Sequence, residues 1–236
     1  MTSANELSQA LTTIRYGRNL EHFPIAVSVE ALAQAWLRQR NAPTGAVVVA
    51  DREISGRSRL GKPFAAQGGL NAAVVVRPPF SPEAEGLLWT WAGLAAVDGY
   101  RAVVGPAAMW WPDLLVADGQ RVGTIGTTAL LAPGRIEAAA LSFRVEADPN
   151  QVPPLLDAVL RSLEASERQM PDELIQRFSK IDHLWGRQLE LALAPRGMAR
   201  GVAVGPDLLG RWTIRTADGV AETYTVDQVR AIRIVP

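Results

Sequence analysis

The segment SGRSRLGKPF, residues 55–64, holds the side chains of this sequence that are best suited to chemistry. Arg57 and Arg59 alternate with small residues, and a guanidinium is a planar, permanent cation that matches two oxygens of a carboxylate or phosphate. Gly56 and Gly61 let the backbone approach a ligand closely. The segment therefore favours an anion-binding loop, although an exposed, charged connector could have the same composition.

Several other chemistries are excluded or disfavoured. The sequence contains no cysteine, which removes disulfides, thiolate metal sites and thiol nucleophiles. His22 and His183 lie far apart and have no neighbours at metal-ligand spacing, so structural or solvent-facing roles are expected for them. No metal-ligating residues are predicted.

Two predicted strands must position the segment 55–64, called the arginine loop below. AVVVA (46–50) is a short, continuous apolar run, as is typical of a buried strand, and LNAAVVVRP (70–78) is a second such run closed by prolines. The loop between them should lie at a sheet end, where binding sites are commonly built.

Helices and further strands complete the larger part of the chain. Residues 29–40 have helical spacing with Ser28 as the N-cap, and the Ser-Pro-Glu at 81–83 opens a predicted helix over 81–100. We also expect strands at 107–111 and 113–117, a hairpin over 121–147, and helices at 151–166 and 171–178.

The pattern of apolar and polar residues changes at about residue 186. Short alternating runs separated by turn signals follow, a pattern that fits a small β-barrel of about five strands. We therefore predict an α+β protein with a larger domain at 1–185 and a small C-terminal barrel at 186–236.

Composition limits the location and partners of the chain. Apolar residues make up 48% of the 236 positions, enough for a sizeable core, and the formal net charge is zero. That balance argues against a chain-wide basic surface for nucleic acid or anionic membrane. The N-terminus lacks a signal pattern and no apolar run approaches ~20 residues, so a cytoplasmic protein is expected.

The stretch VVVADREISGRSRLGKPFAAQGGLNAAVVV (47–76) resembles the ligand loop of the biotin protein ligases, in the biotin/lipoate ligase superfamily. In that family an Ala-Asp precedes a Gly-Arg-Gly-Arg-x-Gly-Arg loop, followed by an aromatic residue, Gly-Gly and Asn. The positions kept here are Gly56, Arg57, Arg59, Gly61, Gly69 and Asn71. The positions changed are Ser58 for glycine, Lys62 for arginine and Phe64 for tryptophan.

Two further segments extend the resemblance over most of the chain. Residues 110–126 are similar to the family's Lys-Trp-Pro-Asn-Asp segment and its following Lys-x-x-Gly-Ile, and residues 186–219 are similar to its C-terminal barrel. The resemblance implies a class II synthetase-like biotin/lipoate ligase catalytic domain with a mixed, largely antiparallel sheet, and an SH3-like β-barrel.

The family resemblance also implies an activity and a set of site residues. Such ligases join a small carboxylic acid to ATP as an acyl-adenylate and pass the acyl group to a carrier-protein lysine. ATP and Mg²⁺ are the implied cofactors, and a homodimer is an implied assembly. The implied catalytic residues are Arg59 and Arg121. The implied substrate-binding residues are Ser28, Glu53, Gly56, Arg57, Ser58, Gly61, Lys62, Gly69, Asn71 and Trp111.

The chain departs from the family at positions that matter for ATP. Trp110 replaces the lysine that leads the Lys-Trp-Pro-Asn-Asp segment, and Leu114 replaces its aspartate. Asp113 replaces the asparagine and could still meet a Mg²⁺ held by phosphates, although a structural role is the stronger expectation. Arg121 stands where the family has lysine, which keeps the charge but changes its shape.

Other departures concern biotin itself. Val29 and Glu30 replace the Thr-Asn of the family's Ser-Thr-Asn, and Glu53 replaces its biotin-reading glutamine. The ureido ring needs neutral donors and acceptors, and each unpaired polar group in a buried site costs about 1–3 kcal/mol. A different acid is therefore expected.

Three functions remain open from the sequence. The first is an ATP-dependent ligase with an altered acid substrate. The second is a catalytically inactive ligase-fold protein that binds a small anionic ligand. The third is a domain that pairs with a protein partner.

Overall fold

The computed structural model describes residues 4–40, 42–57, 59–61 and 68–235. Two of the predicted site residues, Ser58 and Lys62, lie outside the described residues, as does Phe64.

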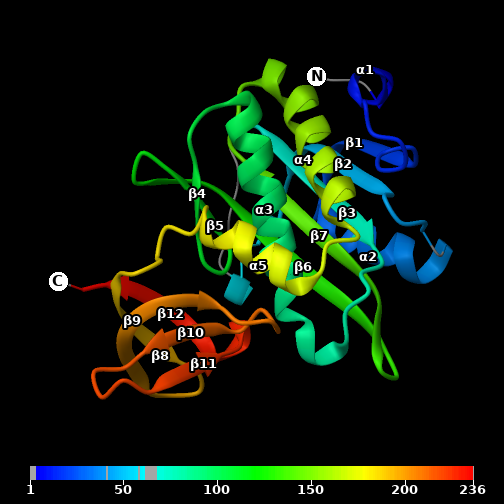
Figure 1. The fold of residues 1–236 in the computed structure, drawn as a ribbon. Helices are drawn as coiled ribbons and strands as arrows, with labels where there is room; N and C mark the ends of the chain where they lie inside the picture. The colour runs from blue at the N-terminus through cyan, green and yellow to red at the C-terminus, as the bar shows by residue number, and fades with distance from the viewer. Residues whose placement is uncertain (1–3, 41, 58, 62–67, 236) are drawn as a thin grey trace.

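A seven-stranded mixed sheet forms the larger part of the molecule (Figure 1). Its spatial order is β1-β2-β3-β7-β6-β5-β4, with β1 and β2 parallel and every other neighbouring pair antiparallel. The strands are β1 (Leu20–Ala26), β2 (Val47–Glu53), β3 (Leu70–Val76), β4 (Ala108–Trp110), β5 (Leu114–Ala117), β6 (Gln120–Ala132) and β7 (Arg135–Val145).

Helices cover both faces of this sheet. They are α1 (Ala4–Ala10), α2 (Val29–Arg40), α3 (Gly86–Val103), α4 (Val152–Ser166) and α5 (Pro171–Ser179). Val47 and Val49 belong to the core formed with α3, α4 and α5, whereas Val48 and Ala50 belong to the core formed with α2. Successive side chains of a strand point to opposite faces, so α2 lies on one face of the sheet and α3, α4 and α5 lie on the opposite face.

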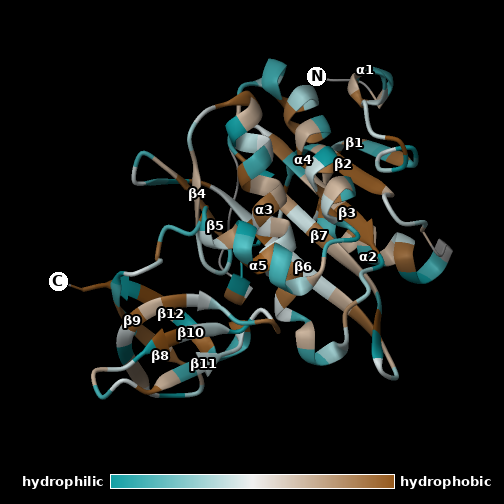
Figure 2. Cartoon of the chain, in the orientation of Figure 1, coloured by the Kyte–Doolittle hydropathy of each residue, from teal (hydrophilic) through white to brown (hydrophobic). Residues whose placement is uncertain are grey.

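The central strands are apolar on both sides because both sides are covered. All seven residues of β3 are buried, and Figure 2 shows hydrophobic residues concentrated on the strands between the helical layers. This burial explains why 46–50 and 70–76 are continuous apolar runs and do not alternate.

The C-terminal part forms a separate five-stranded antiparallel sheet with the order β11-β10-β9-β8-β12 (Figure 1). Its strands are β8 (Gln188–Leu193), β9 (Met198–Pro206), β10 (Trp212–Arg215), β11 (Ala221–Tyr224) and β12 (Val229–Ile234). The α+β class and the five short strands are confirmed. The SH3-like closure and the domain boundary between 185 and 186 remain predictions.

The two sheets are joined by close packing. Trp111 follows β4 and stacks on Trp212 of β10 with ring centroids 4.9 Å apart, and both rings are buried. Gly86 at the start of α3 meets Gly210 so closely that a Cβ on Gly86 would lie 2.6 Å from the Gly210 carbonyl oxygen. The small sheet is therefore fixed against α3 by backbone contact.

The sequence predicted most elements but missed two at the N-terminus. The segments α1 and β1 were not predicted; β1 contains Pro24, which is tolerated because β1 is an edge strand. The helix predicted over 81–100 begins with a short 3₁₀ turn, η2 (Pro82–Ala84), and continues as α3 to Val103. Within the described part of the chain, no helix has the length and apolar character needed to cross a membrane.

Candidate functional site

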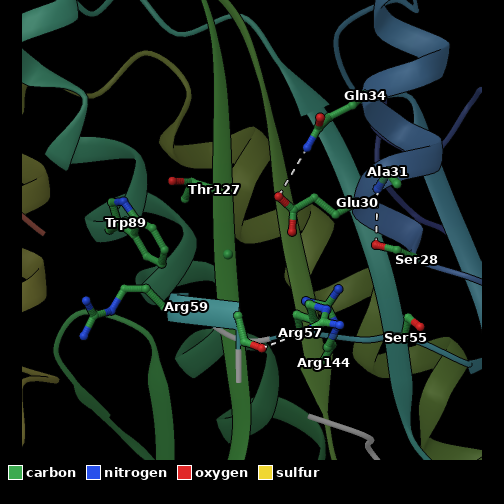
Figure 3. Close-up of a pocket in the computed structure, with 12 residues that line it drawn as sticks. Ser28, Glu30, Ala31, Gln34, Ser55, Arg57, Arg59, Trp89, Thr127 and Arg144 are labelled. Atoms are coloured by element: carbon green, nitrogen blue, oxygen red, sulfur yellow. Dashed lines mark hydrogen bonds between the residues drawn. The ribbon is translucent and has the colours of Figure 1, made fainter. Parts of the chain in front are cut away.

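A cavity of about 510 Å³ opens between α2, β6 and the segment that follows β2 (Figure 3). The residues on its wall used below are Ser28, Glu30, Arg57, Arg59, Trp89 and Arg144. The helix α2 contributes because Ser28 caps it, its Oγ accepting from the Ala31 N–H at 3.3 Å. Arg57 and Arg59 therefore line a concave space.

Arg57 is the more available of the two loop arginines. Its side chain is exposed, and Nη1 donates to the carbonyl oxygen of Gly61 at 2.9 Å. No carboxylate among the described residues forms an ion pair with it. Gly61 has a φ of 69°, which lets the short loop curl back under the guanidinium.

Arg59 is held at the junction of the two sheets. Its Nε lies 3.4 Å from Oδ1 of Asp113, and the side chain is 12% exposed. Its Nη1 donates to two carbonyl oxygens of the C-terminal part, Val226 at 3.2 Å and Val229 at 2.5 Å. Arg59 thus connects the candidate site to the small sheet.

A second pocket of about 260 Å³ lies on the other side of Arg59. Its wall includes three arginines, Arg59, Arg121 and Arg230, together with Trp110 and Asp113. Three such groups around a small volume suit an anion of phosphate type. Arg59 is common to both cavities.

Trp110 on the wall of this second pocket stacks on His183, with ring centroids 5.4 Å apart. Burial, and to a smaller extent the nearby charge of Arg187, lower the pKa of His183. The ring is therefore expected to be neutral at pH 7.

Glu53 forms a buried ion pair beneath the larger cavity. Arg144 donates to its two carboxylate oxygens from Nε at 2.5 Å and from Nη2 at 2.8 Å, and the side chains are 1% and 2% exposed for Arg144 and Glu53 respectively. The same carboxylate accepts the Val29 N–H at 2.8 Å, which anchors the start of α2. Both oxygens of the Glu53 carboxylate thus already accept hydrogen bonds from the protein itself.

A chain of polar contacts continues from this pair to Glu30. Nη1 of Arg144 donates to Ser142 Oγ at 3.4 Å, and that hydroxyl donates to Glu30 Oε2, also at 3.4 Å. The Glu30 carboxylate further accepts from the Thr128 hydroxyl and from Nε2 of Gln34 at 3.3 Å. Polar groups therefore line one wall of the cavity.

Comparison with known proteins relates this arrangement to one group. No family model matches the chain. The bifunctional ligase/repressor BirA of Bacillus subtilis is 24% identical over 255 aligned positions, covering 95% of this chain and 78% of BirA. The biotin protein ligase of Aquifex aeolicus, solved with biotin and ATP, superimposes with a TM-score of 0.69 at 19% identity, covering 92% of this chain and all of that one. The fold is that of a biotin protein ligase.

A third similar structure is itself described as a biotin protein ligase-like protein of unknown function, from Silicibacter sp. TM1040. It has a TM-score of 0.65 and 14% identity, and covers 91% of this chain and 98% of its own. Identities at this level establish the biotin protein ligase-like fold and leave activity to be argued from the site.

The remaining site residues predicted from the biotin protein ligase pattern are mostly internal. Asn71 is buried and donates to the Ala50 carbonyl at 3.4 Å, while its Oδ1 has no partner in the described chain. Trp111 is fully buried against Trp212, and borders the second pocket and not the larger one. Gly56 is buried, and Gly69 is packed against β7. Their substrate-binding roles remain predictions.

Four of the cavity-lining residues discussed above were not predicted as parts of the site: Glu30, Trp89, Arg144 and Arg230. Arg144 had a detectable signal, since a lone arginine within the apolar run of β7 requires a buried acidic partner. Trp89 lies at the N-terminal part of α3 and gave no signal that distinguishes it from a core residue.

Proposed function

We propose that this biotin protein ligase-like protein activates a small carboxylic acid with ATP and transfers it to a carrier-protein lysine. In the first step an oxygen of the acid attacks the α-phosphorus of ATP and pyrophosphate leaves. In the second step the lysine amine attacks the acyl carbon and AMP leaves. The observation that carries the proposal is the position of Arg59, which lines both the larger cavity and the basic second pocket.

The electrostatics of the site suit this chemistry. Negative charge accumulates on the carboxylate and the phosphate oxygens as they react, and fixed cations stabilise it best where water is scarce. Arg57 would hold the acid in the larger cavity, and Arg59 would bridge the acid and the α-phosphate. Arg121 and Arg230 would face the leaving phosphates in the second pocket.

The residues present support binding of ATP better than binding of Mg²⁺. The guanidinium groups of the second pocket suit the phosphates of ATP. For Mg²⁺ the support is weaker, because the Asp113 carboxylate is paired with Arg59 and the described residues contain no group of three or more potential metal ligands. We therefore derive no step through the metal.

Biotin is a poor candidate for the acid. Glu53 occupies the position matched to the family's biotin-reading glutamine, and its oxygens are committed to Arg144 and to the Val29 N–H. Position 53 therefore offers a ureido ring a paired carboxylate in place of a neutral amide. This supports the expectation that the ligase takes another acid.

The test is acid-dependent exchange of labelled pyrophosphate into ATP, over a panel of small carboxylic acids that includes biotin. Arg57→Ala and Arg59→Ala should each reduce exchange about 100- to 1000-fold, the usual effect of removing one charge-stabilising donor. Arg57→Ala is the cleaner variant, because the hydrogen bond that its side chain makes among the described residues goes to a backbone carbonyl. Arg200→Ala, on the exposed face of the small sheet, should retain exchange.

The outcome of the panel decides the proposal. If no acid supports exchange in the wild-type protein, the ligase proposal is wrong. If Arg57→Ala and Arg59→Ala leave exchange intact, the roles given to these two arginines are wrong.

A specific observation favours one alternative, a catalytically inactive ligase-fold protein that binds a small anion. The Arg59 guanidinium is already engaged by Asp113 and two carbonyl oxygens, and Trp110 stands where the family has a lysine. That function predicts thermal stabilisation by a ligand, growing with the logarithm of its concentration, without turnover. A protein-partner function instead predicts a stable complex that Arg57→Ala and Arg59→Ala do not weaken.

A further inference from the structure

We infer that Glu30 makes the larger cavity selective for acids that carry a protonated nitrogen at the end away from their carboxylate. The inference rests on the proposed function, since it names the class of acid that the same site would take. It begins with the charge of the cavity wall.

In the described part of the chain, the hydrogen-bond donors to Glu30 are all neutral groups. Its donors come from three different elements, Gln34 on α2, Thr128 on β6 and Ser142 on β7. Contacts from three sides fix the carboxylate in position without neutralising it. Figure 3 shows this side chain extending from α2 into the space bounded by Trp89 and Thr127.

The nearby cations of the chain are used elsewhere. Arg144 is the guanidinium linked to Glu30 through Ser142, and both its oxygen partners in the buried pair belong to Glu53. Neither Arg57 nor Arg59 forms an ion pair with Glu30 in the part of the chain described. Within residues 4–40, 42–57, 59–61 and 68–235, the cavity therefore presents the Glu30 carboxylate without an ion-pair partner.

The opposite charge enters the cavity from the segment after β2. Arg57 lines the same cavity and has no carboxylate partner of its own in the described chain. A ligand that satisfies both groups has a carboxylate for Arg57 and a cationic N–H donor for Glu30. Charge-assisted hydrogen bonds of this kind are about twice as strong as neutral ones.

Selectivity follows from the cost of the wrong ligand. An acid whose far end is a hydroxyl or a methyl group leaves the Glu30 carboxylate partly desolvated without a cation. A site built around such a polar group rejects the analogue that lacks the matching partner. The class of acid inferred here is therefore an ω-amino or ω-guanidino carboxylic acid.

The experiment is calorimetric titration of the full-length protein with matched pairs of acids, without ATP. One pair is 6-aminohexanoic acid and 6-hydroxyhexanoic acid, with homologues of five, seven and eight carbons and with biotin. At least one of the ω-amino carboxylic acids should bind at least tenfold more tightly than the ω-hydroxy carboxylic acid of the same length. In Glu30→Gln, which keeps the shape of the side chain, the preference should fall below twofold.

The matched control is Glu137→Gln, an exposed glutamate on β7 that does not line the cavity. It should keep the preference of the wild-type protein. Circular dichroism of both variants checks that they are folded.

The results separate this inference from the proposed function. Preference for the hydroxy acids or biotin, no binding by any acid, or a preference that survives Glu30→Gln would overturn the inference. Pyrophosphate exchange supported by acids without the amino preference would leave the ligase proposal standing and the inference wrong. Amino preference without exchange would keep the inference and remove the ligase.

Discussion

Glu53 and Arg144 show how single residues shape this site, because they bury opposite charges 91 positions apart in the sequence. Moving either charge out of water costs several kcal/mol, and that cost is offset when both form a well-aligned, hydrogen-bonded pair. The pair also holds the start of α2 through the Val29 N–H. It thereby fixes the helix that carries Ser28 and Glu30.

Removing one member of the pair should be costly for stability. Glu53→Gln leaves the Arg144 guanidinium buried without a counter-charge, so we expect the free energy of unfolding to fall by about 3–5 kcal/mol. The double variant Glu53→Gln/Arg144→Met should recover most of that loss, because it removes both charges. Urea denaturation of the single and double variants measures the difference.

Arg200→Gln provides the comparison for these variants. It breaks the exposed pair with Glu190, and a surface pair is worth about 0–1 kcal/mol. A loss for Glu53→Gln no larger than that for Arg200→Gln would contradict the role given to the buried pair.

At the scale of elements, the site depends on how the chain enters β3. Gly69 has a φ of 106°, and a Cβ there would lie 2.2 Å from the Val145 carbonyl oxygen at the end of β7. Its neighbour Gly68 also has a positive φ, 88°, but a Cβ there would meet nothing within 4 Å. The two glycines therefore share a backbone conformation and differ in the space around them.

This pair gives a matched test. Gly68→Ala should cost about 1–2 kcal/mol of unfolding free energy, the penalty of a left-handed conformation alone. Gly69→Ala should cost clearly more, because the strand must also move away from β7. Thermal and urea unfolding of the two variants compare them, and equal losses would show that the approach to β7 is not limiting.

The sequence was informative for elements and less so for contacts between them. The runs 46–50 and 70–76 identify β2 and β3 because both faces of these strands are covered. The edge strand β1, in which every residue but Ala26 is exposed or half-buried and which contains Pro24, has no such pattern. Local patterns also placed Arg57 and Arg59 on a loop facing a cavity, but the partners of Arg59 lie 54 and 167 residues away and have no local signature.

At the scale of the whole molecule, Asp182 lies in the segment that leads from the larger sheet to the smaller one. This segment pairs with β4 through the bridge between Met109 and Asp182. Oδ1 of Asp182 accepts the Leu184 N–H at 2.9 Å, while Oδ2 is buried without a partner in the described chain. Burial raises the pKa of this carboxyl from 3.8 to about 7.

The raised pKa predicts how stability depends on pH. Because the folded protein holds this proton more tightly than the unfolded chain, the contribution is full below about pH 4 and is lost as the pH rises through about 7. Asp182→Asn should remove that slope and stabilise the protein at pH 8 by up to about 4 kcal/mol. Urea unfolding between pH 4 and pH 8 measures it.

Asp218→Asn is the control for this measurement. Asp218 is exposed, and a hydrogen bond from Thr216 lowers its pKa, which is the opposite direction. That variant should keep the slope of the wild-type protein. If Asp182→Asn keeps it as well, another group controls the pH dependence.

The hydrogen bonds of Arg59 couple the contents of the site to the C-terminal sheet. An anion that binds Nη1 of Arg59 would compete with the carbonyl oxygens of Val226 and Val229 for this donor. Binding of such an anion would therefore weaken the hydrogen bonds between Arg59 and the C-terminal sheet. With the site occupied in this way, Arg59 would hold the C-terminal sheet less firmly than it does when the site is empty.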